Sequence, residues 1–330
     1  NYTDFIFSKN ILFYVFIFKL FSIFYLNFLI MEPKIKIAQV LFFKRTNPPV
    51  FIISAIIMLV FIIAVTLFNK ISKKIFDSIQ LIIIEKFSWI FTVSTVLFLI
   101  LVLFLLLSRF GSIRLSSADE KPEFGYVTWF AMMFSAGMGI GLVFWSIAEP
   151  IKHFIKPPLI EPVTITPVDQ AISVTFFHWG FHAWAIYVMV GLCLAYFSFR
   201  KGLPLTIRSC FYPLLGNKIY GRWGHCIDIF AVVGTMFGIA TSLGLGAMQI
   251  NSGLNFIGDC PETKLTQIAL IALITLFATV SVVLGLKKGV SRLSYFNVMM
   301  SVILLAFVFI LGPTLFIVNT FGEGLKNYLS

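Results

Sequence analysis

Residues 134–141 read Phe-Ser-Ala-Gly-Met-Gly-Ile-Gly and lie in the middle of an apolar segment at about 125–148. Gly137, Gly139 and Gly141 alternate, so the three do not all share one helix face: Gly137 and Gly141 are four apart, but Gly139 lies on another side. Each glycine inside a helix costs roughly 1 kcal/mol relative to alanine. The stretch therefore predicts a local break in a helix, with close helix packing as the alternative. A helix that breaks inside a bilayer exposes backbone carbonyls and a helix N-terminus, which can hold ions or small polar ligands.

The composition around this stretch is that of a membrane protein. Apolar residues make up 59% of the 330 residues and charged residues 12%, whereas a soluble domain carries about 25% charged residues. The apolar residues form long runs, which indicates an all-α polytopic membrane protein. We predict seven spans, at about 50–68, 88–107, 125–148, 169–197, 226–257, 266–286 and 293–320.

The charge distribution predicts the orientation of the chain. With the N-terminus in the cytoplasm, the inside loops hold 15 Lys and Arg residues and the outside segments hold 8. Such an excess is typical of cytoplasmic loops. The net charge of +11 is therefore explained by the loops, and we expect no nucleic-acid partner. We expect membrane lipid to surround the spans.

The two ends of the sequence are unusual. Residues 1–30 contain no Gly, Ala, Pro or Arg, and we interpret them as a non-native or upstream-translated leader before a start at Met31. A signal anchor or an extra membrane helix at about 11–30 is the alternative. We expect residues 31–49 to be a cytoplasmic segment, and 321–330 to be a truncated end.

A second informative stretch is aromatic. Trp179, Trp184 and Tyr187 fall within an arc of about 140° on one side of a helix. Aromatic faces of this kind can surround a permanent cation such as a quaternary ammonium group. The alternative is ordinary aromatic packing, or a belt of Trp and Tyr at the membrane surface.

Other polar residues give weaker indications. His178 and His182 have the spacing of metal ligands, but the pattern provides no third ligand, so we predict no metal site and no catalytic residue. A membrane metalloenzyme that uses these two residues with Glu149 and His153 remains a remote alternative. Glu149 itself reads equally as a carboxylate at a helix end or as a functional acid. The four cysteines form no CxxC pair.

Five segments together resemble the betaine/carnitine/choline transporter family and cover most of residues 120–315. They are FSAGMGIGLVFWSIAEP, TFFHWGFHAWAIYVMVGLCLAYFSFRKG, FGIATSLGLGAMQINSGL, KKGVSRLSYFNVMM and FVFILGPT. The resemblance implies twelve spans in a leucine-transporter-like fold of two inverted repeats. This chain would hold about seven of them, with two leading transmembrane helices at 50–120 and the first five-helix repeat at 121–320.

The resemblance also implies roles for individual residues. The implied substrate-binding residues are Trp179, Trp184, Tyr187, Gly137, Gly139 and Gly141. The implied sodium-binding positions are the backbone carbonyls of Ser135 and Met138 and, at another site, the Thr235 hydroxyl. One turn after Thr235 a sodium-coupled carrier can have Thr, whereas this chain has Ile239, so that second sodium site is left open. Gly141 is the betaine-like residue, because choline-type members tend to have Asp there.

We therefore expect a secondary active transporter of the bacterial inner membrane that takes up glycine betaine or a related quaternary-ammonium osmolyte. Sodium is the expected coupling ion, and no other cofactor is expected. The alternatives are a choline or carnitine carrier or exchanger of the same family, and an inactive fragment of a decayed gene. A homo-oligomer is left open.

Overall fold

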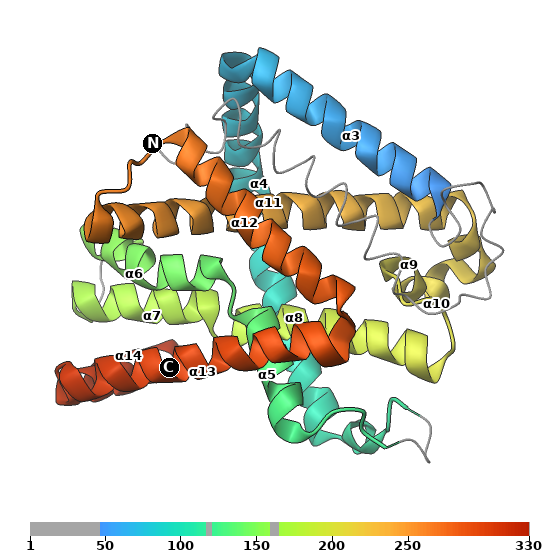
Figure 1. Cartoon of the computed structure of the whole chain (residues 1–330). Helices are drawn as coiled ribbons and strands as arrows, with labels where there is room; N and C mark the ends of the chain where they lie inside the picture. Colours follow the sequence, from blue (N-terminus) through green and yellow to red (C-terminus); the bar gives the residue numbers. More distant parts are fainter. Residues whose placement is uncertain (1–46, 117–120, 159–164, 330) are drawn as a thin grey trace. The chain divides into compact units, whose positions relative to one another are not determined.

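The computed structural model describes residues 47–116, 121–158 and 165–329, and within these residues it is entirely helical (Figure 1). The expectations for residues 1–30 and for a start at Met31 lie outside the described residues. The helices are α3 (Pro48–Leu67), α4 (Asn69–Leu107), η1 (Arg109–Ser112), α5 (Tyr126–Gly137), α6 (Ile140–Ile155), α7 (Pro167–Trp179), α8 (Phe181–Ala195), η2 (Tyr196–Arg200), α9 (Ile207–Cys210), α10 (Tyr212–Leu215), η3 (Gly216–Tyr220), α11 (Arg222–Gly258), α12 (Lys264–Val283), η4 (Leu286–Val290), α13 (Ser291–Leu311) and α14 (Thr314–Leu329).

Six helical segments of the described chain are long and apolar enough to cross a membrane. The pair α5 and α6 makes a seventh span if the two helices count as one, and they are bent by 54° at their break. The described chain thus has six to seven candidate spans, where seven were expected, and the break in the third predicted span is confirmed. The break falls at Met138 and Gly139, between the alternating glycines.

Three predicted span boundaries were wrong, and the fourth span, Pro167–Arg200, has about the predicted bounds but an internal break that was not predicted. α4 begins at Asn69 rather than near 88, because no Gly or Pro interrupts residues 69–107. α6 continues past 148 to Ile155 with Pro150 inside it. The fourth span is interrupted at Gly180, where α7 ends and α8 begins. The seventh ends at Leu311, because the following Gly312 and Pro313 stop the helix, and the predicted division at 320 falls inside α14.

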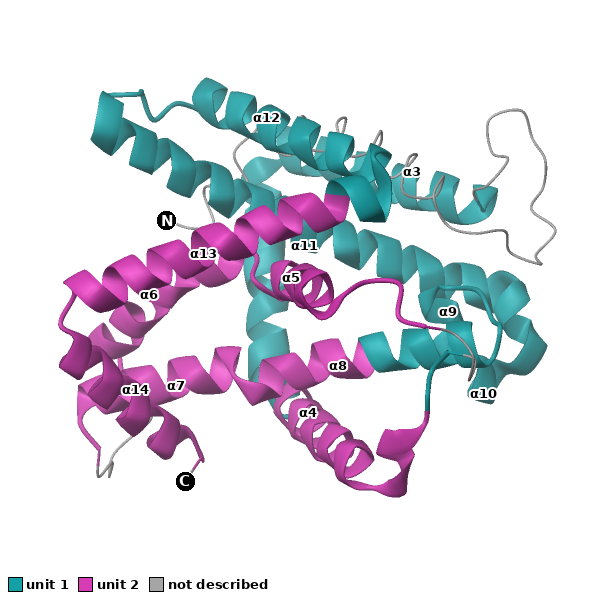
Figure 2. Ribbon diagram, turned by 60° about the horizontal axis from the view of Figure 1, so that its bottom comes forward, with its two compact units in different colours: residues 1–89, 114–120, 191–289 teal, residues 90–113, 121–190, 290–330 magenta. Residues whose placement is uncertain are grey.

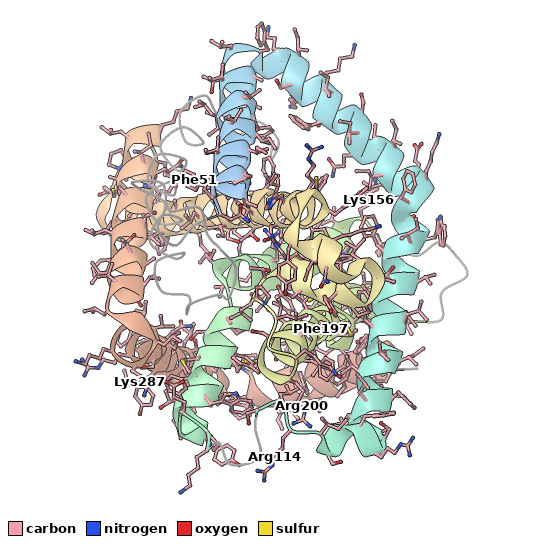
Figure 3. All side chains as sticks on the ribbon, turned by 90° about the vertical axis from the view of Figure 1, so that its right-hand side faces the viewer. Phe51, Arg114, Lys156, Phe197, Arg200 and Lys287 are labelled. Carbon is pink, nitrogen blue, oxygen red and sulfur yellow. The ribbon has the colours of Figure 1, made fainter. Side chains whose placement is uncertain are left out.

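α4 is longer than a bilayer requires. Its 39 residues extend over about 58 Å, whereas the hydrocarbon core is about 30 Å thick. Its side chains project outwards along most of its length (Figure 3), and Ser72 is its one buried residue. Apolar side chains in this position are suited to lipid rather than to a protein core.

The chain folds into two compact units that interleave along the sequence (Figure 2). Unit 1 comprises residues 1–89, 114–120 and 191–289. In its core, Met58 and Ile62 of α3 pack against Met236 of α11. The rings of Phe61 and Phe237 meet edge to face, with centroids 4.7 Å apart.

The segment between η2 and α11 is fastened to unit 1 by a buried ion pair. Arg208 Nε and Nη2 both lie 2.6 Å from Asp228 Oδ2, and Arg208 Nη1 donates to the carbonyl of Ile219 at 3.3 Å. The two side chains are 4% and 12% exposed. Gly224 lets the Ile219 carbonyl approach α11, because a Cβ there would lie 1.7 Å from that oxygen.

Unit 2 comprises residues 90–113, 121–190 and 290–330 and contains α5, α6, α7 and α14. α5 packs on α13, where Asn297 Nδ2 donates to Ser135 Oγ at 3.1 Å and Ser135 Oγ donates to the Ser294 carbonyl at 3.3 Å. α14 packs on α7 at Gly324, where a Cβ would lie 2.5 Å from Ile172.

Replacing Asp228 with Asn should destabilise unit 1 strongly. The change leaves the buried Arg208 guanidinium without its counter-ion, and breaking a buried pair typically costs about 3–5 kcal/mol. Thermal unfolding of the purified chain in detergent measures the effect. Glu262→Gln is the matched control, because its exposed carboxylate accepts a hydrogen bond from Ser252 and is not part of a buried ion pair. Equal melting temperatures for the two variants would contradict a stabilising role for the ion pair.

Candidate functional site

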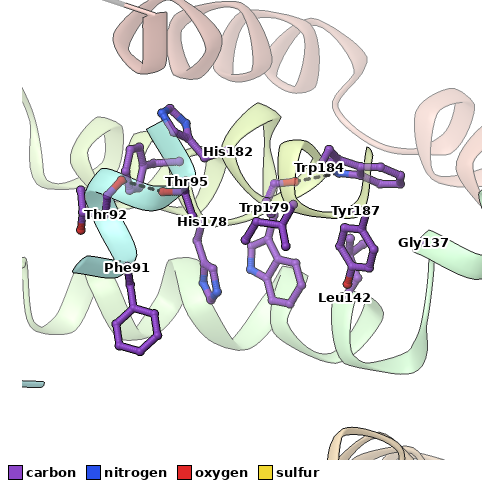
Figure 4. A pocket seen from close by; sticks show the side chains of 13 residues that line it. Phe91, Thr92, Thr95, Gly137, Leu142, His178, Trp179, His182, Trp184 and Tyr187 are labelled. Atoms are coloured by element: carbon purple, nitrogen blue, oxygen red, sulfur yellow. Dashed lines mark hydrogen bonds between the residues drawn. The ribbon is translucent and has the colours of Figure 1, made fainter. Parts of the chain in front are cut away.

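An aromatic cavity of about 420 Å³ lies within unit 2 (Figure 4). Its lining combines the end of α5, the start of α6, the interrupted α7 and α8, and one turn of α4. The lining residues are Phe91, Thr92, Thr95, Gly137, Leu142, Phe177, His178, Trp179, His182, Ala183, Trp184, Ile186 and Tyr187. We refer to this set as the aromatic cavity.

The three aromatic residues predicted from the sequence meet at this cavity. Trp179, Trp184 and Tyr187 all line it, and Trp179 and Tyr187 point to the same side of their helices (Figure 4). The Trp184 and Tyr187 ring centroids are 5.9 Å apart. The Trp184 indole N–H donates to the Trp179 carbonyl at 3.1 Å. The indole N–H of Trp184 is thus occupied by the protein, while its ring borders the cavity.

Gly137 fits against Trp184. A Cβ added at Gly137 would lie 2.3 Å from the Trp184 ring, closer than real contacts allow. The missing side chain therefore gives Trp184 its place in the wall of the cavity. Gly139 and Gly141 do not line the cavity, and a Cβ at either would meet nothing within 4 Å. The three glycines thus have different surroundings, although the sequence presents them as one motif.

The backbone around the break departs from the helical hydrogen-bond ladder. In a continuous helix the N–H of Gly139 would bond to the Ser135 carbonyl, and that of Leu142 to the Met138 carbonyl. Here Gly139 N–H donates to Gly137 at 3.1 Å and Leu142 N–H donates to Gly139 at 3.1 Å. The carbonyls of Ser135 and Met138 are therefore released from their usual helical donors.

Thr235 lies in unit 1, whereas Ser135 and Met138 lie in unit 2. Its hydroxyl donates to the Ala231 carbonyl at 2.7 Å and its side chain is exposed. Ile239, one turn later, is 42% exposed. Because they belong to different units, Thr235 and Ile239 share no unit with Ser135 and Met138.

Glu149 is a buried side chain whose surroundings the sequence did not reveal. It is 5% exposed and lies inside α6, so the interpretation as a carboxylate at a helix end was wrong. Its oxygens accept from Trp179 Nε1 at 2.7 Å and pair with His178 Nδ1 at 2.8 Å and His153 Nε2 at 3.2 Å. This carboxylate links α6 to α7 directly behind the aromatic cavity.

His178 and His182 do not share a ligand site, although they stand four apart. His178 faces Glu149, whereas His182 Nδ1 lies 2.8 Å from the hydroxyl of Tyr328 on α14. The interruption at Gly180 separates the two turns. Among the residues that the structure describes, no group of three or more His, Cys, Asp or Glu side chains is arranged to hold a metal ion.

Two contributions to the site were missed from the sequence. Phe91, Thr92 and Thr95 of α4 line the cavity, and the two hydroxyls three residues apart in an apolar run were the available signal. α14 supports the back of α7 and α8, where Tyr328 stacks on Phe181 with ring centroids 6.0 Å apart. The Gly-Pro pair before α14 could have indicated a separate helix.

Comparison with known proteins agrees with these features. The chain is 44% identical over 288 residues to the glycine betaine transporter of Acinetobacter baylyi, a match that covers 87% of this chain and 44% of the relative. It is 46% identical over 258 residues to the glycine betaine transporter OpuD of Bacillus subtilis, covering 78% and 50%. It is 41% identical over 286 residues to the osmo-dependent choline transporter BetT2 of A. baylyi, covering 87% and 42%.

The chain thus spans about half of the length, or less, of these three relatives. Residues 49–330 match the family described as BCCT, betaine/carnitine/choline family transporter. That range includes every span and the whole aromatic cavity. The chain is therefore a multi-pass membrane protein that belongs to the betaine/carnitine/choline transporter family, a family of transporters and not of enzymes.

Proposed function

We propose that this chain forms the cation-binding part of a secondary active transporter that takes up glycine betaine or a closely related quaternary-ammonium osmolyte. The observation that carries the proposal is the aromatic cavity, with Trp179, Trp184 and Tyr187 around one space of about 420 Å³. Indole and phenol faces attract a cation that cannot donate hydrogen bonds. Two relatives named as glycine betaine transporters support this substrate class.

Glycine betaine is proposed over choline because of Gly141. Betaine carries its own carboxylate, whereas choline carries none, so a choline carrier gains from a protein carboxylate beside the cation. Gly141 provides no such group. A relative named as a choline transporter keeps choline as the alternative substrate.

Sodium is the proposed coupling ion, and the backbone break supports it. The carbonyls of Ser135 and Met138 are released from their usual helical donors, and carbonyl oxygens of a broken membrane helix are suited to a small cation. Thr235 is proposed for a second site with its hydroxyl as the ligand. The absence of a hydroxyl at Ile239 weakens that second assignment.

The proposed architecture is the first part of a leucine-transporter-like fold. Two leading helices would precede a first five-helix repeat at 121–320, and a second inverted repeat would complete the substrate site. Carriers of this design move one set of helices against the other around a site at the bilayer midplane. The N-terminus is proposed to lie in the cytoplasm of a bacterial cell, with the spans in the inner membrane.

Replacing Trp184 with Leu should weaken betaine uptake more than replacing Phe181 with Leu. Trp184 borders the cavity, whereas Phe181 stacks on Tyr328 and does not line it. A desolvated cation on an indole face is worth up to about 2 kcal/mol, or roughly thirtyfold in affinity. The measurement is the KM of radiolabelled betaine uptake.

The assay uses a chimera in which residues 49–330 replace the matching part of B. subtilis OpuD, in a strain without betaine carriers. Equal effects of the two substitutions would argue for ordinary packing. A wild-type chimera that takes up no betaine would contradict the proposed function itself.

Replacing Gly141 with Asp in the same chimera should shift its preference from betaine towards choline. A Cβ at this position would meet nothing within 4 Å, so the first carbon of the new side chain causes no clash. Gly141 does not line the aromatic cavity, so this expectation rests on the family resemblance, in which choline-type members tend to have Asp at this position. The new carboxylate would then repel that of betaine and attract the cation of choline. The measurement is the ratio of betaine to choline uptake, with Gly141→Asn as the uncharged control. An unchanged ratio would contradict the role assigned to Gly141.

A further inference from the structure

The carboxylate of Glu149 is buried in the interior of α6, where an ionised group needs hydrogen-bond donors around it. It has three, and they come from both helices that it joins. Trp179 Nε1 and His178 Nδ1 approach from α7, and His153 Nε2 from the next turn of α6. The Trp179 bond is 2.7 Å long, a length typical of charge-assisted hydrogen bonds.

We propose that Glu149 is a positioning residue for Trp179, and that it acts on substrate binding through this indole. This inference rests on the transport function proposed above. Glu149 is not among the residues that line the cavity. Its carboxylate contacts two lining residues, Trp179 and His178. Of these two, Trp179 has the aromatic face suited to a cation, so we assign the effect to its ring.

The geometry gives Glu149 control over the plane of the indole. A tryptophan side chain has two torsion angles, and a hydrogen bond at Nε1 restricts rotation of the ring about both of them. Trp184 is held separately, because its Nε1 donates to the backbone carbonyl of Trp179 at 3.1 Å. Glu149 therefore acts on the Trp179 ring and not on Trp184.

The charge of Glu149 adds to this orientation. A carboxylate that accepts the indole N–H polarises the ring, because hydrogen bonds in a medium of low dielectric reinforce one another. More negative density on the ring face strengthens its attraction for a cation. A glutamine at position 149 would keep the shape of the side chain. It would offer one acceptor oxygen and one N–H₂ donor to a site that already contains three donors, so at least one donor would lose its acceptor.

A purely structural role for Glu149 is the competing explanation, since the residue also ties α6 to α7. The two explanations differ in what happens when the indole N–H is removed. If Glu149 acts through Trp179, its effect on substrate binding should vanish in a Trp179→Phe background. If it only joins the helices, its effect should persist there.

The first experiment observes the hydrogen bond without substrate. The 330-residue chain contains six tryptophans, and ¹H–¹⁵N spectra of the chain in detergent resolve their indole N–H signals. Trp179→Phe assigns the signal of Trp179. We expect Glu149→Gln to move this signal, while Glu262→Gln, an exposed carboxylate in unit 1, leaves it in place. An unmoved Trp179 signal in Glu149→Gln would overturn the proposal.

The second experiment is a double-mutant cycle in the OpuD chimera. We expect Glu149→Gln to raise the KM for betaine about tenfold with little change in the maximal rate or melting temperature, as loss of a charged hydrogen bond would. In the Trp179→Phe background the same change should alter KM less than about twofold. An equal fold-change in both backgrounds would overturn the proposal. If the wild-type chimera takes up no betaine, the proposed transport function is rejected instead. The indole spectrum is recorded without transport, so it still tests the hydrogen bond between Glu149 and Trp179.

Discussion

Every backbone N–H and C=O inside a bilayer needs a partner, because hydrocarbon offers none. α5 and α6 depart from this rule at Met138 and Gly139, where the helix bends by 54° and its hydrogen-bond ladder is rerouted. Such a departure is tolerated only where the backbone faces other protein groups or a water-filled space. The aromatic cavity beside Gly137 is such a place. The rest of unit 2 depends on this break, since α6 after it packs along α7 and thereby sets Glu149 against Trp179.

The aromatic wall depends in turn on small features that carry no chemistry of their own. Gly137 leaves room for the Trp184 ring, and Gly180 ends α7 so that Trp184 can bond to the Trp179 carbonyl. α14 covers the opposite side, with Tyr328 beside Phe181 and His182. An open cavity that is lined by aromatic rings, two of them held by hydrogen bonds at their indole N–H groups, suits a ligand that is charged but has no hydrogen to donate.

Much of this arrangement could be predicted from the sequence, for identifiable reasons. The alternating glycines at 137, 139 and 141 located the break. Trp179, Trp184 and Tyr187 line one cavity, but the continuous helix assumed for their spacing is broken at Gly180. The partners of Glu149 could not be predicted, because His178 and Trp179 are about thirty residues away and on another helix. The positions of Gly and Pro also indicate the full length of α4 and the start of α14 as a separate helix, but the predicted spans did not use them.

The central claim is that the aromatic cavity recognises a positive charge and does not merely accommodate an apolar group. The most direct measurement compares glycine betaine with 3,3-dimethylbutanoate, its isostere in which carbon replaces the quaternary nitrogen, as competitors for radiolabelled betaine in the OpuD chimera. Both have the same shape and the same carboxylate, so their difference isolates the cation. The account predicts that betaine competes roughly thirtyfold more strongly, the value of about 2 kcal/mol for a desolvated cation on aromatic faces. Equal competition by the two compounds would contradict it.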